Sequence, residues 1–261
     1  MKTIAYVNIK GGVGKTSTIV LTSRAVARSR KNGRKILNID LDPNNTLGSV
    51  FIPKNIKEID PQNAKLVSNA LLSPNDDLAD YIIPSRYPNI DLLRSSPALT
   101  RVFPSPNLLL NKLRNSEITE TYDYVFIDSP ATYGQIHIMA LQAADVIVSP
   151  LNLSRFDYQP LKQLGINISM DTTPNKLADW RLFYTKIKTQ QSRNQSDYMQ
   201  LFEKQFSGRI LDAQIPDTTK IRFCIDRNVL VGHGEFQRLR DAICRHASEV
   251  TGEEINPEEN F

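Results

Sequence analysis

The chain has 261 residues, of which 40% are hydrophobic and 23% are charged, a composition typical of a folded globular domain. It contains no run of about 18 apolar residues, which argues against a membrane-spanning helix. Cys224 and Cys244 lack a nearby His or Cys at metal-ligand spacing, which disfavours a zinc or iron–sulfur protein. The net charge of +4 and the isoelectric point near 9.0 permit contact with nucleic acid but do not require it.

A glycine-rich segment follows the first predicted strand. Residues 4–9 are mainly apolar, residues 10–17 read K-G-G-V-G-K-T-S, and a helical pattern covers residues 18–31. Strand, glycine loop and helix is the order that a phosphate-binding loop requires, because the glycines let successive N–H groups converge and the helix adds its positive dipole end. We therefore predict a nucleotide phosphate site at Gly11, Gly12, Val13, Gly14, Lys15, Thr16 and Ser17. In such a site Lys15 reaches the β- and γ-phosphates, and the Thr16 hydroxyl is a ligand of Mg²⁺.

The loop departs from the usual pattern G-x-x-x-x-G-K-[ST], because Ile9 stands in place of the first glycine and Lys10 heads the loop. K-G-G-V-G-K-T resembles the deviant Walker A motif of the ParA/MinD family of ATPases. In that family the additional lysine of one subunit reaches the phosphates that the other subunit holds. The resemblance implies a homodimer that forms in ATP, with Lys10 as a catalytic residue alongside Lys15.

The second predicted strand, residues 35–39, runs into Asp40-Leu41-Asp42-Pro43. Two carboxylates at positions i and i+2 of an extended segment point the same way, toward the crevice at the carboxyl end of the strand. The segment resembles switch I of the same family. This implies that Asp42 positions the attacking water and that Asp40 helps to hold Mg²⁺. From the residues alone, an aspartate that caps a turn before Pro43 is the alternative.

The middle of the chain gives the weakest signal, since five prolines interrupt residues 48–89. We expect short helices near 64–72 and 77–82, a strand over 90–93 and a helix over 108–113. The strand at 122–127 then ends at Asp128, which resembles a Walker B segment and implies that Asp128 holds Mg²⁺ or a water bound to it. The residues that follow, 131–134, correspond to switch II of the family.

The last part of the chain continues the alternation, with strands expected over 144–150, 181–187 and 210–215, and helices over 156–168, 194–206 and 236–250. This order predicts an α/β fold with a doubly wound, mostly parallel sheet flanked by helices. We expect a single domain over residues 1–261, with an acidic, flexible tail at 251–261. In the family, the loop after the last strand packs near the adenine base, which implies that Pro216 and Asp217 are base-pocket residues.

Basic residues near this loop suggest a DNA interface. Members of the ParA type bind DNA non-specifically through basic side chains, and such contacts are directed at phosphates and weakened by salt. Lys220 and Arg222 match the neighbourhood of those residues, and Arg193 is a further candidate.

The resemblance favours a partition ATPase that uses ATP and Mg²⁺. We expect a cytoplasmic, nucleoid-associated homodimer that binds duplex DNA non-specifically in ATP and is released when a ParB-like or other cargo adaptor stimulates hydrolysis. A MinD-like membrane-positioning ATPase is one alternative, although the acidic C-terminal residues would be repelled by anionic lipid. A metabolic P-loop enzyme of the dethiobiotin synthetase or iron-protein type is another. A nucleotide-binding scaffold without hydrolysis is countered by the presence of Asp42.

Overall fold

The computed structural model describes residues 1–29, 33–53, 65–73, 75–114, 117–172, 179–188, 193–227 and 236–257. Within them, eight strands form one sheet in the order β3-β4-β2-β5-β1-β6-β7-β8, and only β3 is antiparallel to its neighbour. The strands are β1 (Lys2–Tyr6), β2 (Ile36–Asp40), β3 (Ile83–Pro84), β4 (Ile90–Leu93), β5 (Tyr124–Asp128), β6 (Val146–Asn152), β7 (Trp180–Ile187) and β8 (Ile210–Pro216). The prediction of a doubly wound, mostly parallel sheet is confirmed.

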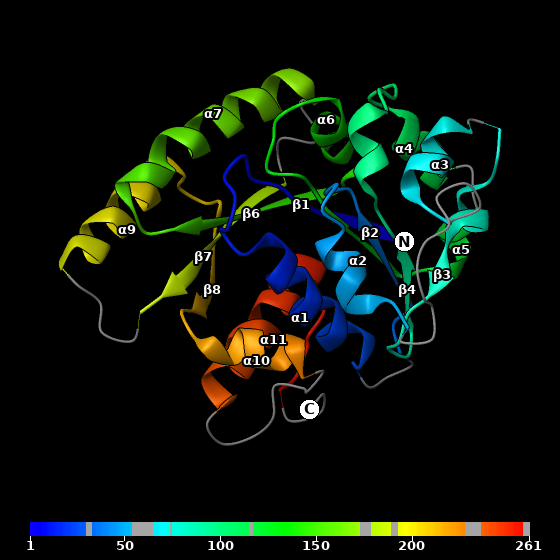
Figure 1. Ribbon diagram of the computed structural model, residues 1–261. Coiled ribbons are helices and arrows are strands. Elements are labelled where there is room, and N and C mark those ends of the chain that lie inside the picture. The colour runs from blue at the N-terminus through cyan, green and yellow to red at the C-terminus, as the bar shows by residue number, and fades with distance from the viewer. Residues whose placement is uncertain are drawn as a thin grey trace.

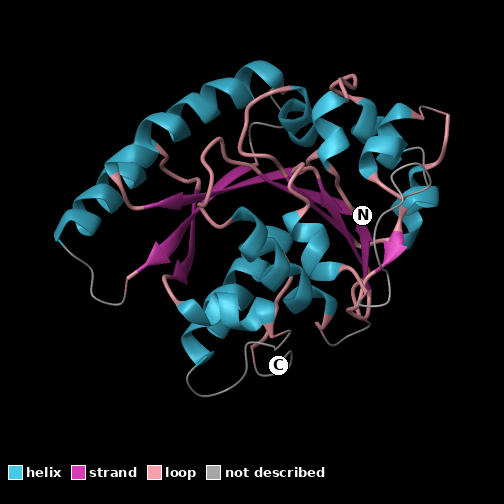
Figure 2. Ribbon diagram, viewed as in Figure 1, coloured by secondary structure: helices cyan, strands magenta, loops and turns pink. Residues whose placement is uncertain are grey.

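Helices cover both faces of the sheet (Figures 1 and 2). One face carries α1 (Lys15–Ala27), α2 (Thr46–Phe51), α10 (Thr219–Asp226) and α11 (Gln237–Thr251). The other carries α3 (Val67–Leu72), α4 (Leu108–Arg114), α5 (Ile118–Thr121), α6 (Gln135–Ala143), α7 (Arg155–Asp171) and α9 (Arg193–Gln205). Two 3₁₀ helices, η1 (Leu78–Tyr81) and η2 (Pro97–Arg101), lie in the connections around β3 and β4. No described helix combines the length and the apolar character needed to cross a bilayer.

Alternation along β1 divides the core into two clusters. Ile4 and Tyr6 point into the cluster beneath α1 and α11, whereas Ala5 and Val7 point into the cluster beneath α6 and α7. All four side chains are fully buried. A strand that is buried on both faces accounts for the nearly continuous apolar run at residues 4–9.

The strand order fixes where a ligand can bind. After β1, the strands β2 and β4 lie on one side of β1 in the sheet, and the later strands β6, β7 and β8 lie on its other side. The direction in which strands are added therefore reverses beside β1. In open α/β sheets, ligands bind outside the carboxyl ends of the strands at such a reversal. The register pairs Tyr6 and Asp40 with Asp128 from either side, which brings the ends of β1, β2 and β5 to one level.

The clearest addition to the expected elements is α10, since no element was predicted over residues 219–226. Thr218 caps this helix, because its side chain accepts a hydrogen bond from the N–H of Lys220 at 3.2 Å. The apolar residues Ile221, Cys224 and Ile225 follow at helical spacing. Both the cap and the spacing are visible in the sequence. Helices α2 and α6 were likewise not predicted.

The C-terminal segment also differs from the expected flexible tail. Gly252 ends α11 with a left-handed φ of +81°, and its N–H donates to the Ser248 carbonyl at 2.8 Å. Ile255 is 3% exposed, and Glu253 forms an ion pair with Arg34 at 2.8 Å. Up to Pro257 the segment is therefore packed on the domain, while residues 258–261 lie outside the described ranges.

A buried pair in the core gives a testable pH dependence. The Tyr6 hydroxyl and Nε2 of His246 lie 2.8 Å apart, both residues are fully buried, and burial lowers the pKa of His246 to about 3. Below the ordinary pKa of about 6.5, His246 is protonated in the unfolded chain but stays neutral in the folded chain. The free energy of unfolding therefore falls by about 1.4 kcal/mol for each pH unit. His246→Gln keeps an acceptor for Tyr6 and does not titrate. Urea unfolding at pH 7.5 and 5.5 should show the wild type losing about 1.4 kcal/mol more than the variant, and equal losses would contradict this assignment.

Candidate nucleotide site

The glycine loop connects β1 to α1 in a conformation that only glycine adopts easily. Gly12 and Gly14 have φ values of +71° and +101°, and Gly14 stands directly before the first residue of the helix. Val13 between them is buried and anchors the loop. The free N–H groups at the start of α1 therefore face the space above the loop, where an anion is favoured.

Lys15 lies at the base of this loop and is 7% exposed. Its ammonium group donates a hydrogen bond to the Asn8 carbonyl at 3.2 Å. Burial lowers the pKa of Lys15, and the nearby carboxylates of Asp128 and Asp42 oppose this shift. The cation is thus held in a poorly hydrated position, from which it can neutralise a phosphate group.

Thr16 and Asp128 form the second part of the site. The Thr16 hydroxyl donates to Oδ2 of Asp128 at 2.5 Å, and Asp128 is fully buried. Burial raises the pKa of Asp128 to about 7, and its Oδ1 atom has no hydrogen-bond partner among the described residues. A buried carboxylate with an unused oxygen beside a hydroxyl fits Mg²⁺, which binds oxygen ligands and takes few of them from the protein.

Asp40 holds the loop after β2. Its Oδ1 atom accepts from the N–H of Asp42 at 2.9 Å, and its Oδ2 atom accepts from the N–H of Gly48 at 2.8 Å. Burial and the neighbouring Asp128 raise the pKa of Asp40 well above its ordinary range. The observed contacts of Asp40 position the backbone that carries Asp42, while its role as a metal ligand stays a prediction.

Asp42 is half-buried and faces a second cavity of about 470 Å³. Its Oδ1 atom accepts from the backbone N–H and the side-chain amide of Asn44, at 3.0 and 2.9 Å. The opposite wall of the cavity consists of residues 130–137, so the two predicted switch segments face each other. The structure therefore brings Lys15, Thr16, Asp42 and Asp128 to one end of the sheet.

His137 also lines this second cavity and was not predicted. It is fully buried, and its Nδ1 atom lies 3.4 Å from the Pro130 carbonyl, which only accepts. Burial lowers the pKa of His137 to about 4, so the ring is neutral near pH 7 and Nε2 is an acceptor without a partner in the described residues. Only the fold could place this isolated histidine beside the switch segments.

Lys10 forms an ion pair within its own chain. Its ammonium group lies 2.8 Å from Oδ2 of Asp157, which is 4% exposed in the first turn of α7. The Ser154 hydroxyl donates to the same oxygen. Asp157 was not singled out in the sequence, and its contact with Lys10 joins segments 147 residues apart.

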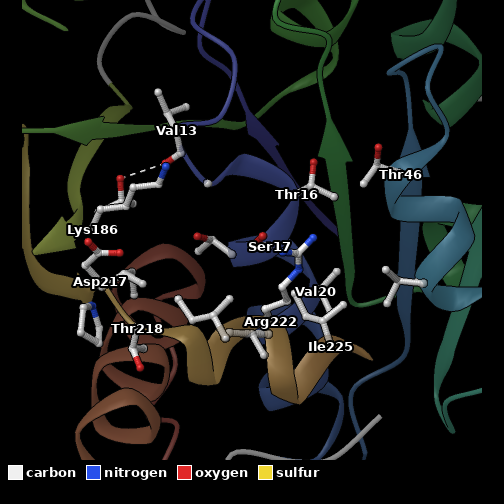
Figure 3. A pocket seen from close by; sticks show the side chains of 18 of the residues that line it. Val13, Thr16, Ser17, Val20, Thr46, Lys186, Asp217, Thr218, Arg222 and Ile225 are labelled. Atoms are coloured by element: carbon white, nitrogen blue, oxygen red, sulfur yellow. Dashed lines mark hydrogen bonds between the residues drawn. The ribbon is translucent and has the colours of Figure 1, made fainter. Parts of the chain in front are cut away.

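A large cavity of about 630 Å³ begins at the glycine loop and runs along α1 toward β8 and α10 (Figure 3). Pro216 and Asp217 line it, and their contact with a base stays a prediction. Apolar walls come from α1 and from the unpredicted α10, and β7 joins the loop through the Thr185 hydroxyl, which donates to the Val13 carbonyl at 2.9 Å. The cavity has the size of a nucleotide site, and α10 lines it with Ile221 and Ile225 as well as with Arg222 and Asp226.

Two of the predicted DNA contacts, Lys220 and Arg222, lie on different faces of α10. Arg222 lines the large cavity and points into it (Figure 3). Lys220 is two residues away, which is about 200° around the helix, and its ammonium group lies 5.1 Å from the centre of the Phe236 ring. Arg193 is the first residue of α9, but its side chain lies outside the described residues.

Comparisons with known proteins agree with this geometry. A family model described as "AAA domain" matches residues 1–176. An uncharacterised protein of Pseudomonas putida is 31% identical over 169 residues, which cover 64% of this chain and 62% of that protein. The chromosome-partitioning ATPase Soj of Treponema pallidum is 26% identical over 227 residues, which cover 84% of this chain and 85% of that protein. The match to the Pseudomonas putida protein thus spans less than two thirds of that relative's length.

Solved structures share the fold over nearly the whole chain. The ATP complex of McdA from Cyanothece has a TM-score of 0.81 at 21% identity and covers 97% of each chain. A cobyrinic acid a,c-diamide synthase from Mycobacterium smegmatis, with a bound ATP analogue and magnesium, has a TM-score of 0.72 at 19% identity and covers 98% of each chain. At these identities the likeness shows the fold alone.

Proposed function

Because the chain belongs to the AAA-domain family and is of the ParA type, we propose that it is an ATP-dependent partition ATPase. In this proposal Mg²⁺-ATP drives homodimerisation and non-specific DNA binding, and a cargo-bound, ParB-like adaptor stimulates the hydrolysis that releases the protein. The observation that carries the proposal is the arrangement at the ends of β1, β2 and β5. There the phosphate loop and Thr16 line the large cavity, Thr16 bonds to Asp128, and Asp42 lines the second cavity.

The residues present support hydrolysis without a covalent intermediate. Thr16 and Asp128 would hold Mg²⁺, which when bound neutralises phosphate charge. Lys15 would neutralise the same phosphates from the base of the loop, and Asp42 would orient a water for attack on the γ-phosphate. Catalysis of this kind depends on positioning and charge, because phosphoryl transfer needs no covalent help from the protein.

The ion pair of Lys10 supports an enzyme whose turnover is controlled by ATP-dependent dimer formation. To reach a neighbour's phosphates, Lys10 must leave the buried carboxylate of Asp157. A bound triphosphate would replace Asp157 as the anion beside Lys10, while Asp157 would keep the hydrogen bond from the Ser154 hydroxyl. Closure of a dimer would then depend on ATP, and turnover by a single chain would be slow.

We propose that Lys220 and Arg193 contact DNA. The protein would then be cytoplasmic and associated with the nucleoid. Lys220 is half-buried beside Phe236, so its stem is ordered while its charge stays near the surface. The contact is directed at backbone phosphates and therefore weakens as salt rises.

Retention of duplex DNA in ATP and in ADP, over a range of salt, tests the function. We expect binding in ATP that is lost in ADP and falls with salt. Lys220→Glu should weaken it at every salt concentration and reduce the salt slope by about one. Lys162→Glu makes the same charge change on α7, which covers the opposite face of the sheet, and should leave retention unchanged. Equal retention in ATP and ADP would contradict a nucleotide-controlled DNA switch.

A further inference from the structure

The basic residues of α10 have different surroundings, and this suggests a separate role for Arg222. Ile221, Arg222, Ile225 and Asp226 line the large cavity and occupy two adjacent i, i+4 rows of the helix. Phe223 faces elsewhere, because its ring packs against Phe236 with centroids 6.0 Å apart. One face of α10 therefore belongs to the nucleotide cavity.

Arg222 is only loosely held in place. It forms an ion pair with Asp226 on the next turn, at 3.9 Å between Nε and Oδ2, and both side chains are largely exposed. An exposed pair at this distance contributes little to stability. The guanidinium is thus available to a better anion, and Figure 3 shows it directed from α10 into the cavity, toward Ser17.

The position of Arg222 in the cavity indicates which part of a nucleotide it would meet. Phosphates bind at the glycine loop and at the start of α1, whereas a base fits between the apolar residues and Pro216 at the other end. Arg222 points toward Ser17, the third residue of α1, and thus toward the start of this helix (Figure 3). The phosphate closest to the base is the α-phosphate. A cavity of about 630 Å³ has the volume that a nucleotide needs.

We propose that Arg222 binds the α-phosphate of the bound nucleotide and does not contact DNA. The inference rests on the proposed binding of ATP. A guanidinium is suited to this role, since it remains charged and can give two parallel hydrogen bonds to a phosphate. Arg222 then raises the affinity for every nucleotide that has an α-phosphate, whatever the number of phosphates beyond it.

Calorimetry with ADP, AMP and adenosine in Mg²⁺ tests the proposal on Arg222→Gln, with Arg227→Gln as the control. Arg227 ends the same helix, is exposed and does not line the cavity. Arg222→Gln should weaken ADP and AMP about tenfold and leave adenosine unchanged, and Arg227→Gln should change none of them. At saturating ATP, Arg222→Gln should retain DNA like the wild type.

Each contrary result has a distinct meaning. If the wild type binds ADP and Arg222→Gln binds it equally well, the inference is overturned while the proposed function stands. An equal loss for adenosine would place the contact on the base or ribose and overturn the α-phosphate assignment. Weaker DNA retention with unchanged ADP affinity would restore the DNA role. A wild type that binds no ADP would overturn the proposed function and this inference together.

Discussion

Replacing Asp42 by alanine should leave ATP bound and lower its hydrolysis at least about a hundredfold. The phosphates are expected to bind at the glycine loop and Lys15, neither of which depends on the Asp42 side chain. The water that attacks the γ-phosphate would lose its only proposed orienting carboxylate. Single-turnover release of phosphate, measured together with ATP affinity, separates the two effects.

Two variants complete this experiment. Lys15→Ala removes the buried cation beneath the loop and should abolish ATP binding itself. It is therefore the control in which hydrolysis is lost because ATP no longer binds. Asn44→Ala removes one of the two hydrogen bonds that hold Oδ1 of Asp42, and should slow hydrolysis only severalfold because the backbone bond remains. Turnover by Asp42→Ala within a few-fold of the wild type would remove Asp42 from the mechanism.

Loss of Lys10 should be equally severe for turnover, and it offers a test of subunit exchange. Lys10→Ala is expected to bind ATP but to hydrolyse it at least roughly a hundredfold more slowly, since a cation supplied across an interface stabilises the charge of the transition state. Asp157 loses its partner in the same variant, so the melting temperature should be recorded alongside.

Mixing two inactive variants decides whether Lys10 acts across an interface. A dimer of one Lys10→Ala chain and one Asp42→Ala chain contains one complete site, formed by Asp42 of the first chain and Lys10 of the second. An equimolar mixture should therefore recover about a quarter of the wild-type rate, because half of the dimers are mixed and each has one working site in two. If Lys10 instead acts on the nucleotide of its own chain, no activity returns on mixing.

Strong local signals made most of the fold predictable. The buried strands read as apolar runs, and the order strand, glycine loop, helix needs no distant residue to be recognised. For this reason, strands such as 90–93 and the long helix α7 lie close to where the sequence placed them. Helix α10 was missed, although Thr218 and the apolar spacing after it marked its start.

The sequence by itself determined the α/β architecture and the identity of the phosphate loop, because both follow from short-range patterns of apolar residues and glycine. Only the tertiary structure decided which distant side chains meet: Lys10 with Asp157, His137 with the switch cavity, and Arg222 with the nucleotide cavity. These contacts join separate strands and helices, and their geometry depends on the order of strands in the sheet and on the rotation of each helix about its axis. No local stretch of the sequence specifies the strand order or the rotation of a helix.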